Sequence, residues 1–221
     1  MSLTMAPQSP EMEALRGRLL ATTLNHVPFD GWSERALRNG AADAGVELED
    51  ALRAFPAGIR DVLDYFVADA DQRMIEELER RDLASMRIRD RIAVAIRVRL
   101  EQNAAHREAI RQAIAQQILP TNGPRSMRSL YRTVDAMWYA AGDTATDFNF
   151  YTKRALLAGV YTSTLLYWLD DDSPDFEDSW AFLDRRIENV MGIEKAKARI
   201  KRFVSHAPKP LDRNPFRHRR V

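Results

Sequence analysis

Fifteen consecutive residues without a charged side chain, 155–169, constrain the fold of this chain more than any other feature. A helix that is apolar on all sides is normally buried, either in a protein core or in a membrane. Fifteen residues at 1.5 Å each extend about 22 Å, which is short of the roughly 30 Å of bilayer hydrocarbon. Thr162, Ser163 and Thr164 lower the hydrophobicity further. The stretch therefore predicts a central core helix, around which the rest of the chain packs.

Helix-capping residues flank this stretch on both sides. Gly142 predicts the end of the preceding helix, and Asp143 or Thr144 is suited to cap the core helix. After the acidic residues 170–172, Ser173 is suited to cap a further helix with Pro174 at its first position. The acidic run lacks the spaced ligands and the glycine of a calcium loop, so we interpret it as a capping segment.

The first 56 residues have the outline of a helix-turn-helix unit. Helices are predicted over 11–25, 34–44 and around 48–55, with a turn at Pro28, Asp30 and Gly31. The outline resembles the N-terminal domain of TetR-type repressors. In the recognition segment, however, Glu47, Glu49 and Asp50 outnumber Arg53 and would repel DNA phosphates. We therefore predict the shape of a helix-turn-helix without its DNA-binding function.

Helical periodicity continues to the central stretch, and no segment alternates as a strand would. The predicted helices cover 59–81, 87–102, 107–119 and 125–141, and Pro120, Gly123 and Pro124 mark a break. The five arginines of 87–102 are expected on a solvated face. The fold class is therefore all-α.

The C-terminal segment is basic, whereas the rest of the chain is acidic. Residues 193–221 contain ten lysines and arginines against two acidic residues, a net +8, which leaves −7 for the first 192 residues because the whole chain is +1. Residues 193–205 form an amphipathic pattern that either lies on an anionic membrane or packs on the domain. The candidate membrane-binding residues are Ile193, Lys197, Ile200, Lys201, Phe203 and Val204.

Catalytic patterns are missing from the sequence. The chain has no cysteine, its four histidines are far apart, and it contains no H-E-x-x-H, Walker or G-x-S-x-G motif. We therefore predict a binding protein rather than an enzyme, with no catalytic residues, no cofactor and no metal ligands.

Two motifs carry a resemblance to a known family. A-M-W-Y-A-A-G-D-T-A-T-D-F-N-F-Y-T-K-R at 136–154 and D-D-S-P-D-F-E-D-S-W-A-F-L at 171–183 resemble those of the Coq-nine family of coenzyme Q (ubiquinone) biosynthesis proteins. The resemblance weakens but persists back to H-V-P-F-D-G-W at 26–32. It departs at Phe150, where the family usually has tryptophan, so a hydrogen bond from an indole N–H is lost there.

The resemblance implies a non-enzymatic protein that binds isoprenoid lipids at a membrane. Such a protein would present a ubiquinone precursor to the di-iron hydroxylase that modifies the demethoxyubiquinone ring. Carried onto this chain, the hydroxylase-binding residues would be Asp135, Met137, Trp138, Asp147, Phe150, Tyr151 and Arg154. Trp138, Met137 and Tyr151 are expected on one exposed face, although Met137 and Tyr151 could equally be core residues.

We therefore expect a TetR-like all-α bundle that forms a homodimer and binds no nucleic acid. The predicted segments are a disordered N-terminus (1–10), a three-helix unit (11–56), a lipid-binding and dimerisation domain (57–192), a membrane helix (193–206) and a basic tail (207–221). Residues 1–10 resemble neither a signal nor a transit peptide, which favours the bacterial cytoplasm with peripheral attachment to the inner membrane. A mature organellar protein without its leader, on the matrix side of the mitochondrial inner membrane, would look the same. The alternatives are a ligand-sensing TetR-type regulator, which a salt-dependent DNA-binding assay would reveal, and a free lipid carrier.

Overall fold

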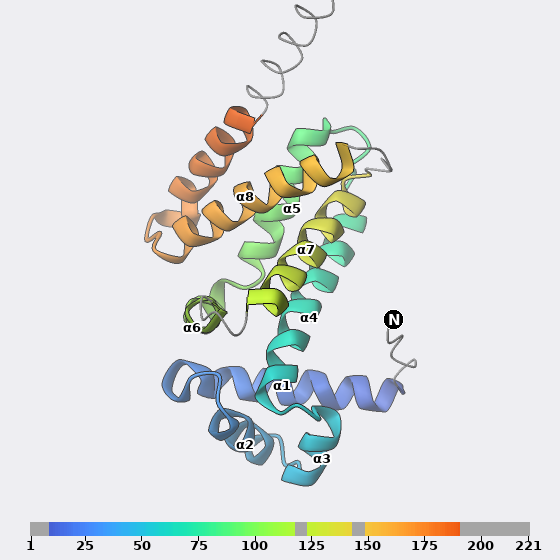
Figure 1. Cartoon of the computed structure of the whole chain (residues 1–221), viewed down its shortest axis with the longest axis vertical. Helices are drawn as coiled ribbons and strands as arrows, with labels where there is room; N and C mark the ends of the chain where they lie inside the picture. The colour runs from blue at the N-terminus through green and yellow to red at the C-terminus, as the bar shows by residue number, and fades with distance from the viewer. Residues whose placement is uncertain (1–8, 118–122, 143–148, 191–221) are drawn as a thin grey trace, which may run out of the picture.

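The chain is all-α in the part that its computed structural model describes, residues 9–117, 123–142 and 149–190. Figure 1 shows two tiers, with α1 to α3 in the lower one and a larger helical bundle above them. Helix α4 rises from the lower tier into the bundle and joins the two (Figure 1). The all-α prediction is confirmed for the described residues.

Three helices make up the lower tier. They are α1 (Pro10–Asp30), α2 (Glu34–Asp43) and α3 (Leu48–Ala54). Two serines cap them as their types predict: the Ser9 hydroxyl accepts from the Met12 N–H at 3.2 Å, and that of Ser33 from the Ala36 N–H at 3.3 Å.

Helix α1 continues past the predicted end at residue 25. Pro28 lies in its last turn, where the missing N–H removes only one helical hydrogen bond. The helix ends at Gly31, whose φ of 68° suits glycine and whose N–H donates to the Val27 carbonyl at 2.9 Å. The predicted turn at residues 28–31 was therefore wrong for Pro28 and Asp30.

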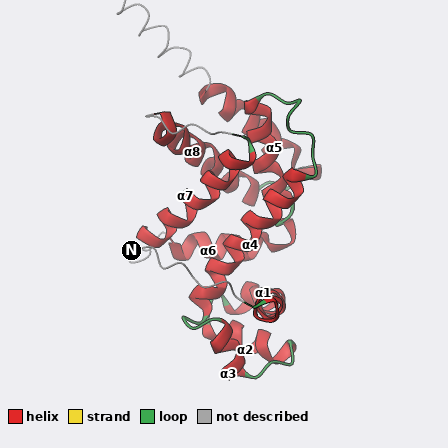
Figure 2. Cartoon of the chain, turned by 90° about the vertical axis from the view of Figure 1, so that its right-hand side faces the viewer, coloured by secondary structure: helices red, strands yellow, loops and turns green. Residues whose placement is uncertain are grey.

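The upper tier contains further α-helices among the described residues, and Figure 2 shows α4, α5 and α7 running side by side. They are α4 (Ile59–Glu79), α5 (Ile88–Glu101), α6 (Arg107–Gln117), α7 (Gly123–Ala140), α8 (Asn149–Leu169) and a helix over residues 177–190 that follows the short turn η3 (Pro174–Phe176). The predicted ranges match these helices within a few residues.

Within the described part of the chain, the buried apolar residues form two hydrophobic cores. The larger lies among α4, α5, α7, α8 and the helix of 177–190. The smaller joins α1 to α3 with Ile59, Val62 and Phe66 of α4 and with Ala109 and Ala113 of α6. The three N-terminal helices therefore share their core with the bundle, and the boundary between residues 56 and 57 stays a prediction.

Helix α8 is less buried than its composition predicts. Leu157, Val160, Tyr161 and Trp168 face the larger core. Residues on the opposite side are exposed in the single chain, namely Ala155, Gly159, Leu166 and Tyr167. The prediction of a helix buried on all sides was wrong for the monomer, because α8 lies along one flank of the bundle rather than at its centre.

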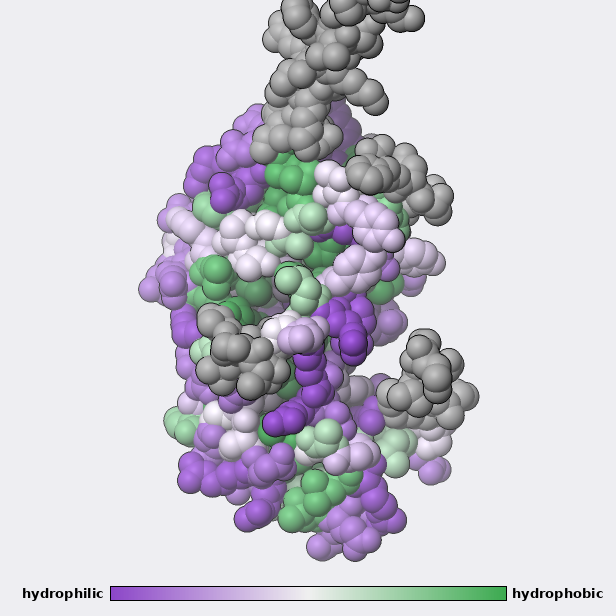
Figure 3. Space-filling model, in the orientation of Figure 1, coloured by the Kyte–Doolittle hydropathy of each residue, from purple (hydrophilic) through white to green (hydrophobic). Residues whose placement is uncertain are grey.

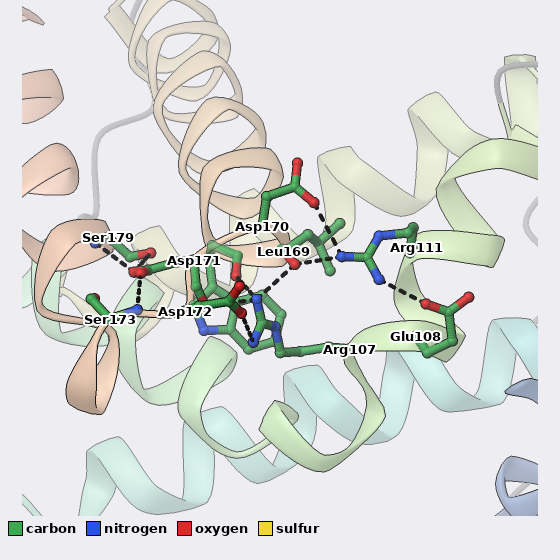
Figure 4. A network of polar contacts seen from close by, with 10 residues as sticks. Arg107, Glu108, Arg111, Leu169, Asp170, Asp171, Asp172, Ser173 and Ser179 are labelled. Carbon is green, nitrogen blue, oxygen red and sulfur yellow. Dashed lines mark hydrogen bonds and ion pairs between the residues drawn. The ribbon is translucent and has the colours of Figure 1, made fainter.

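Two arginines of α6 fasten the end of α8, as Figure 4 shows. Arg107 donates from one nitrogen to the carbonyls of Trp168, Leu169 and Asp171 at 2.7–2.9 Å. Its guanidinium also lies 5.5 Å from the Trp168 ring. Arg111 donates to the Leu169 carbonyl at 2.5 Å. The last carbonyls of a helix have no partner within it and carry negative partial charge, so arginine side chains stabilise them.

Asp171 holds the chain that leaves α8 (Figure 4). Its carboxylate accepts from the N–H of Ser173 at 2.8 Å and from the N–H and hydroxyl of Ser179 at 2.9 and 2.5 Å. The Ser173 hydroxyl in turn accepts from the Asp178 N–H at 3.1 Å. The capping interpretation of the acidic run is confirmed, with Asp171 as the principal capping side chain.

Replacing Asp171 with alanine is expected to lower the free energy of unfolding by about 2 kcal/mol, because three donors lose a charged acceptor. The exposed Asp172→Ala variant is the control, with an expected change below about 0.5 kcal/mol. Urea unfolding measures both, and equal losses would contradict the assignment.

The stabilisation by the Asp171 carboxylate is expected to depend on pH. Burial alone would raise the pKa of Asp171, but the hydrogen bonds from Ser179 and Ser173 outweigh it and lower the pKa from 3.8 to about 2. Because the folded-state pKa is depressed, this stabilisation is present above pH 3.8 and is lost as the pH falls towards 2. The difference in stability between the parent and Asp171→Ala should shrink over that interval.

Candidate functional site: an apolar cavity and the α7–α8 patch

A cavity of about 460 Å³ lies between α4, α6, α7 and α8. Its walls are mostly apolar, and the chief contributors are Leu63, Phe66, Val67, Ile110, Ile114, Met127, Leu130, Leu165 and Leu166. Apolar residues also reach the outer surface on the face drawn in Figure 3, among mostly hydrophilic ones. A mainly apolar pocket of this size with a few polar groups is typical of small-molecule binding sites.

The polar groups of the cavity gather around Arg99. The side chain donates from Nε to Asp71 Oδ1 at 2.8 Å and from Nη1 to the Tyr161 hydroxyl at 2.7 Å. Thr133 donates to the other Asp71 oxygen at 3.0 Å, and Asn103 donates to the Arg99 carbonyl at 2.7 Å. Arg99 and Tyr161 therefore bring a buried, hydrogen-bonded polar group into the lining of a mainly apolar cavity.

Sequence reasoning missed this group, because the arginines of α5 were all expected in solvent. For Arg99 that prediction was wrong, since only 7% of the residue is exposed. A signal was present: Ile92, Ile96 and Arg99 follow one another at helical spacing, which places Arg99 on the core face of α5.

The second candidate surface lies at the end of α7 and the start of α8. Arg91 of α5 fastens the end of α7 by donating to the Ala141 carbonyl at 2.9 Å. Gly142 follows with a φ of 82°, which favours glycine, as the predicted helix break requires. The predicted capping residues Asp143 and Thr144 lie outside the described residues.

An ion pair joins the two helices. Arg154 of α8 is buried and donates from Nε to Asp135 Oδ1 of α7 at 2.7 Å. Its guanidinium carbon lies 3.3 Å from the centre of the Phe150 ring, and that ring lies edge-on to Tyr151 at 5.2 Å. We call Asp135, Trp138, Phe150, Tyr151 and Arg154 the α7–α8 patch.

Tyr151 is the most exposed member of the patch, with 71% of the residue accessible to solvent. Trp138 is half-buried, and the Lys153 ammonium lies 5.5 Å from its ring. The Trp138 indole N–H is buried without a hydrogen-bond acceptor among the described residues. The structure thus brings five of the seven predicted partner-binding residues together.

The other two predicted partner-binding residues, Met137 and Asp147, are not part of the patch. Met137 is fully buried in the larger core, so it does not lie on one exposed face with Trp138 and Tyr151 as predicted. The reason is helical geometry: Val134, Met137 and Ala141 share the inner side of α7, and Trp138 is turned about 100° away. Asp147 lies outside the described residues.

The candidate membrane-binding residues also lie outside the described part of the chain, namely Ile193, Lys197, Ile200, Lys201, Phe203 and Val204. Within the ranges 9–117, 123–142 and 149–190, no helix is both long and apolar enough to span a bilayer. Over the same ranges, no group of three or more acidic, histidine or cysteine side chains is placed to hold a metal ion.

Comparison with known proteins gives consistent results. A family model described as COQ9 matches residues 123–194, which include the α7–α8 patch. The mitochondrial ubiquinone biosynthesis protein COQ9 of Rattus norvegicus is 35% identical over 196 residues, covering 86% of this chain and 62% of that protein. COQ9-B of Xenopus laevis is 36% identical and covers 85% and 66% respectively. The Schizosaccharomyces pombe protein is 29% identical and covers 84% and 74%.

The chain spans about three fifths of the length of the mammalian relatives that it matches. A solved TetR transcriptional regulator from Nitrosomonas europaea superposes with a TM-score of 0.66 at 21% identity, over 79% of this chain and 97% of that one. At this identity the likeness concerns the fold, and it confirms the predicted TetR-like bundle.

Proposed function

Because the chain is similar to COQ9 proteins over most of its length, we propose that it is a member of that family and a non-enzymatic accessory protein of ubiquinone biosynthesis. In this proposal it binds an isoprenoid quinone intermediate at a membrane surface and presents it to the di-iron hydroxylase that modifies the demethoxyubiquinone ring. The observation that carries the proposal is the mainly apolar cavity of about 460 Å³ with a few polar groups in its lining, Arg99 and Tyr161 among them. Its make-up suits a lipid that has one polar group.

The α7–α8 patch supports the second part of the proposal. Exposed aromatic side chains beside arginine are the composition of interface hot spots, and Tyr151 and Arg154 belong to such a group. The patch therefore has the chemistry of a protein-docking surface, and the hydroxylase is its proposed partner.

The exposed side of α8 supports a homodimer. In TetR-like proteins the last two bundle helices pair across a two-fold axis, and here Tyr167 of α8 is an exposed large side chain. Tyr167 stacks on Phe182 of the neighbouring helix at 4.6 Å, so the two helices offer a joint surface.

The lipid-binding proposal is tested by mass spectrometry of lipids that copurify with the full chain. We expect an isoprenoid quinone or its precursor in near-stoichiometric amount. Recovery of the protein without any isoprenoid lipid, from cells that make ubiquinone, would contradict the proposal.

The C-terminal segment carries the proposed membrane contact. Replacing Phe203 with glutamate should weaken flotation with anionic liposomes, and ending the chain at Gly192 should weaken it further, because the net +8 is lost as well. Each basic residue near an anionic surface contributes about 1 kcal/mol. Unchanged flotation of both variants would place the segment on the protein instead.

A further inference from the structure

Arg99 has hydrogen-bonding capacity that the protein does not use. Its Nε and Nη1 donate to Asp71 and Tyr161, whereas Nη2 has no hydrogen-bond acceptor among the described residues. The residue is 7% exposed and lines the cavity. Among the described residues, Nη2 is not one of the fully buried polar atoms that lack a partner. It is therefore accessible from the cavity that Arg99 lines, where a bound oxygen atom can accept its hydrogen bond.

The Tyr161 hydroxyl offers a second donor at the same place. It accepts the hydrogen bond from Arg99, and within the described ranges it donates to no other atom. Burial raises the pKa of Tyr161, although the nearby Arg99 guanidinium opposes that rise, so the phenol keeps its proton at neutral pH. Two donors therefore meet at the polar end of the cavity.

The charge at this end is balanced. The Asp71 carboxylate already accepts from Arg99 and from Thr133, so the positive charge of Arg99 has its counter-ion. A carboxylate or phosphate brought here would face Asp71 as well as Arg99. A neutral oxygen acceptor, such as the carbonyl of a quinone, suits two spare donors without adding charge.

The solvent exposure of the lining residues distinguishes the mouth of the cavity from its inner end. Arg99, Tyr161 and Thr133 at the polar end are buried, whereas Met127 and Leu166 of the lining are 69% and 49% exposed. The exposed residues mark the mouth and the polar group marks the inner end. The apolar residues Ile110, Ile114 and Leu130 also contribute to the walls.

We propose that the cavity holds its ligand head inward, with a neutral ring oxygen bound by Arg99 and Tyr161 and the isoprenoid tail directed to the mouth at Met127 and Leu166. This inference rests on the proposed lipid binding and adds an orientation and a specificity. A ring held in this way is shielded from the surface, so it has to leave through the mouth before an enzyme can act on it.

The experiment compares full-length variants with two probes by titration calorimetry. One probe is a benzoquinone with a short alkyl tail, and the other is an alkylbenzene with the same tail. Tyr161→Phe removes only the hydroxyl, and Arg99→Lys keeps a cation beside Asp71. Leu165→Ala, in the apolar lining, is the control. Thermal melting tests whether each variant is folded.

We expect Tyr161→Phe and Arg99→Lys to weaken quinone binding by about tenfold, as the loss of one hydrogen bond predicts, and to leave alkylbenzene binding unchanged. Leu165→Ala should weaken both probes alike. If the two polar variants bind the quinone as the parent does while Leu165→Ala weakens it, the orientation is wrong and lipid binding stands. Tighter binding of an alkyl carboxylate than of the quinone would also overturn the neutral-oxygen assignment. If the parent binds neither probe, both the inference and the proposed lipid binding fail.

Discussion

Tyr151→Ala is expected to abolish association with the di-iron hydroxylase and, in cells, ubiquinone production. The side chain is 71% exposed and packs edge-on against Phe150. Anchor residues of this kind often cost 2 kcal/mol or more when truncated, which is about thirtyfold in affinity. Because the ring adds little to the core, helicity, melting temperature and copurifying lipid should stay unchanged. Copurification measures the association with the hydroxylase, and circular dichroism melting measures helicity and melting temperature.

Two further variants make the result specific. Tyr131 of α7 is also an exposed tyrosine, but it lies outside the patch. Tyr131→Ala should therefore leave the association with the hydroxylase intact. Met137→Ala should lower stability by about 2–5 kcal/mol, because it leaves a cavity in the core. Full association by a well-folded Tyr151→Ala protein would show that the α7–α8 patch is not the docking surface.

The helices themselves were predictable because local chemistry determines them. Ser9 and Ser33 cap their helices through hydrogen bonds within three residues, and Gly142 ends α7 with a positive φ that glycine adopts readily. Such signals act over one helical turn and can therefore be recognised in a sequence. The continuation of α1 through Pro28 shows their limit, since a proline in a last turn removes too little to end the helix.

Which side of a helix is buried depends on contacts distant in sequence. Tyr161 lies 62 residues from Arg99, and Asp71 lies 28 residues from it, so no local pattern could show that the three side chains meet beside a cavity. Similarly, the uncharged stretch of α8 indicates burial but not whether another helix of the same chain or a second molecule covers each side. Met137 and Trp138 are adjacent in sequence, and only the packing of α7 assigns the first to the core and the second to the patch.

The second large effect is expected for Arg107→Ala, which should lower the free energy of unfolding by about 3 kcal/mol. The variant removes a charged donor from the carbonyls of Trp168, Leu169 and Asp171 and a cation from the face of the Trp168 ring. The carbonyls of Trp168 and Asp171 then lose their arginine partner, and that of Leu169 keeps only Arg111. Figure 4 shows these contacts at the connection between α8 and the helix of 177–190, which the variant should loosen.

Arg111→Ala is the matched control for this site, because it alters the same helix one turn later. Arg111 also reaches the Leu169 carbonyl, but it is more exposed than Arg107 and shares its charge with Glu108 and Asp170 at the surface. Exposed ion pairs contribute little, so its loss should be about 1 kcal/mol or less. Urea unfolding of both variants gives the comparison. A loss of about 1 kcal/mol or less for both variants would mean that α8 is held by its apolar contacts rather than by Arg107.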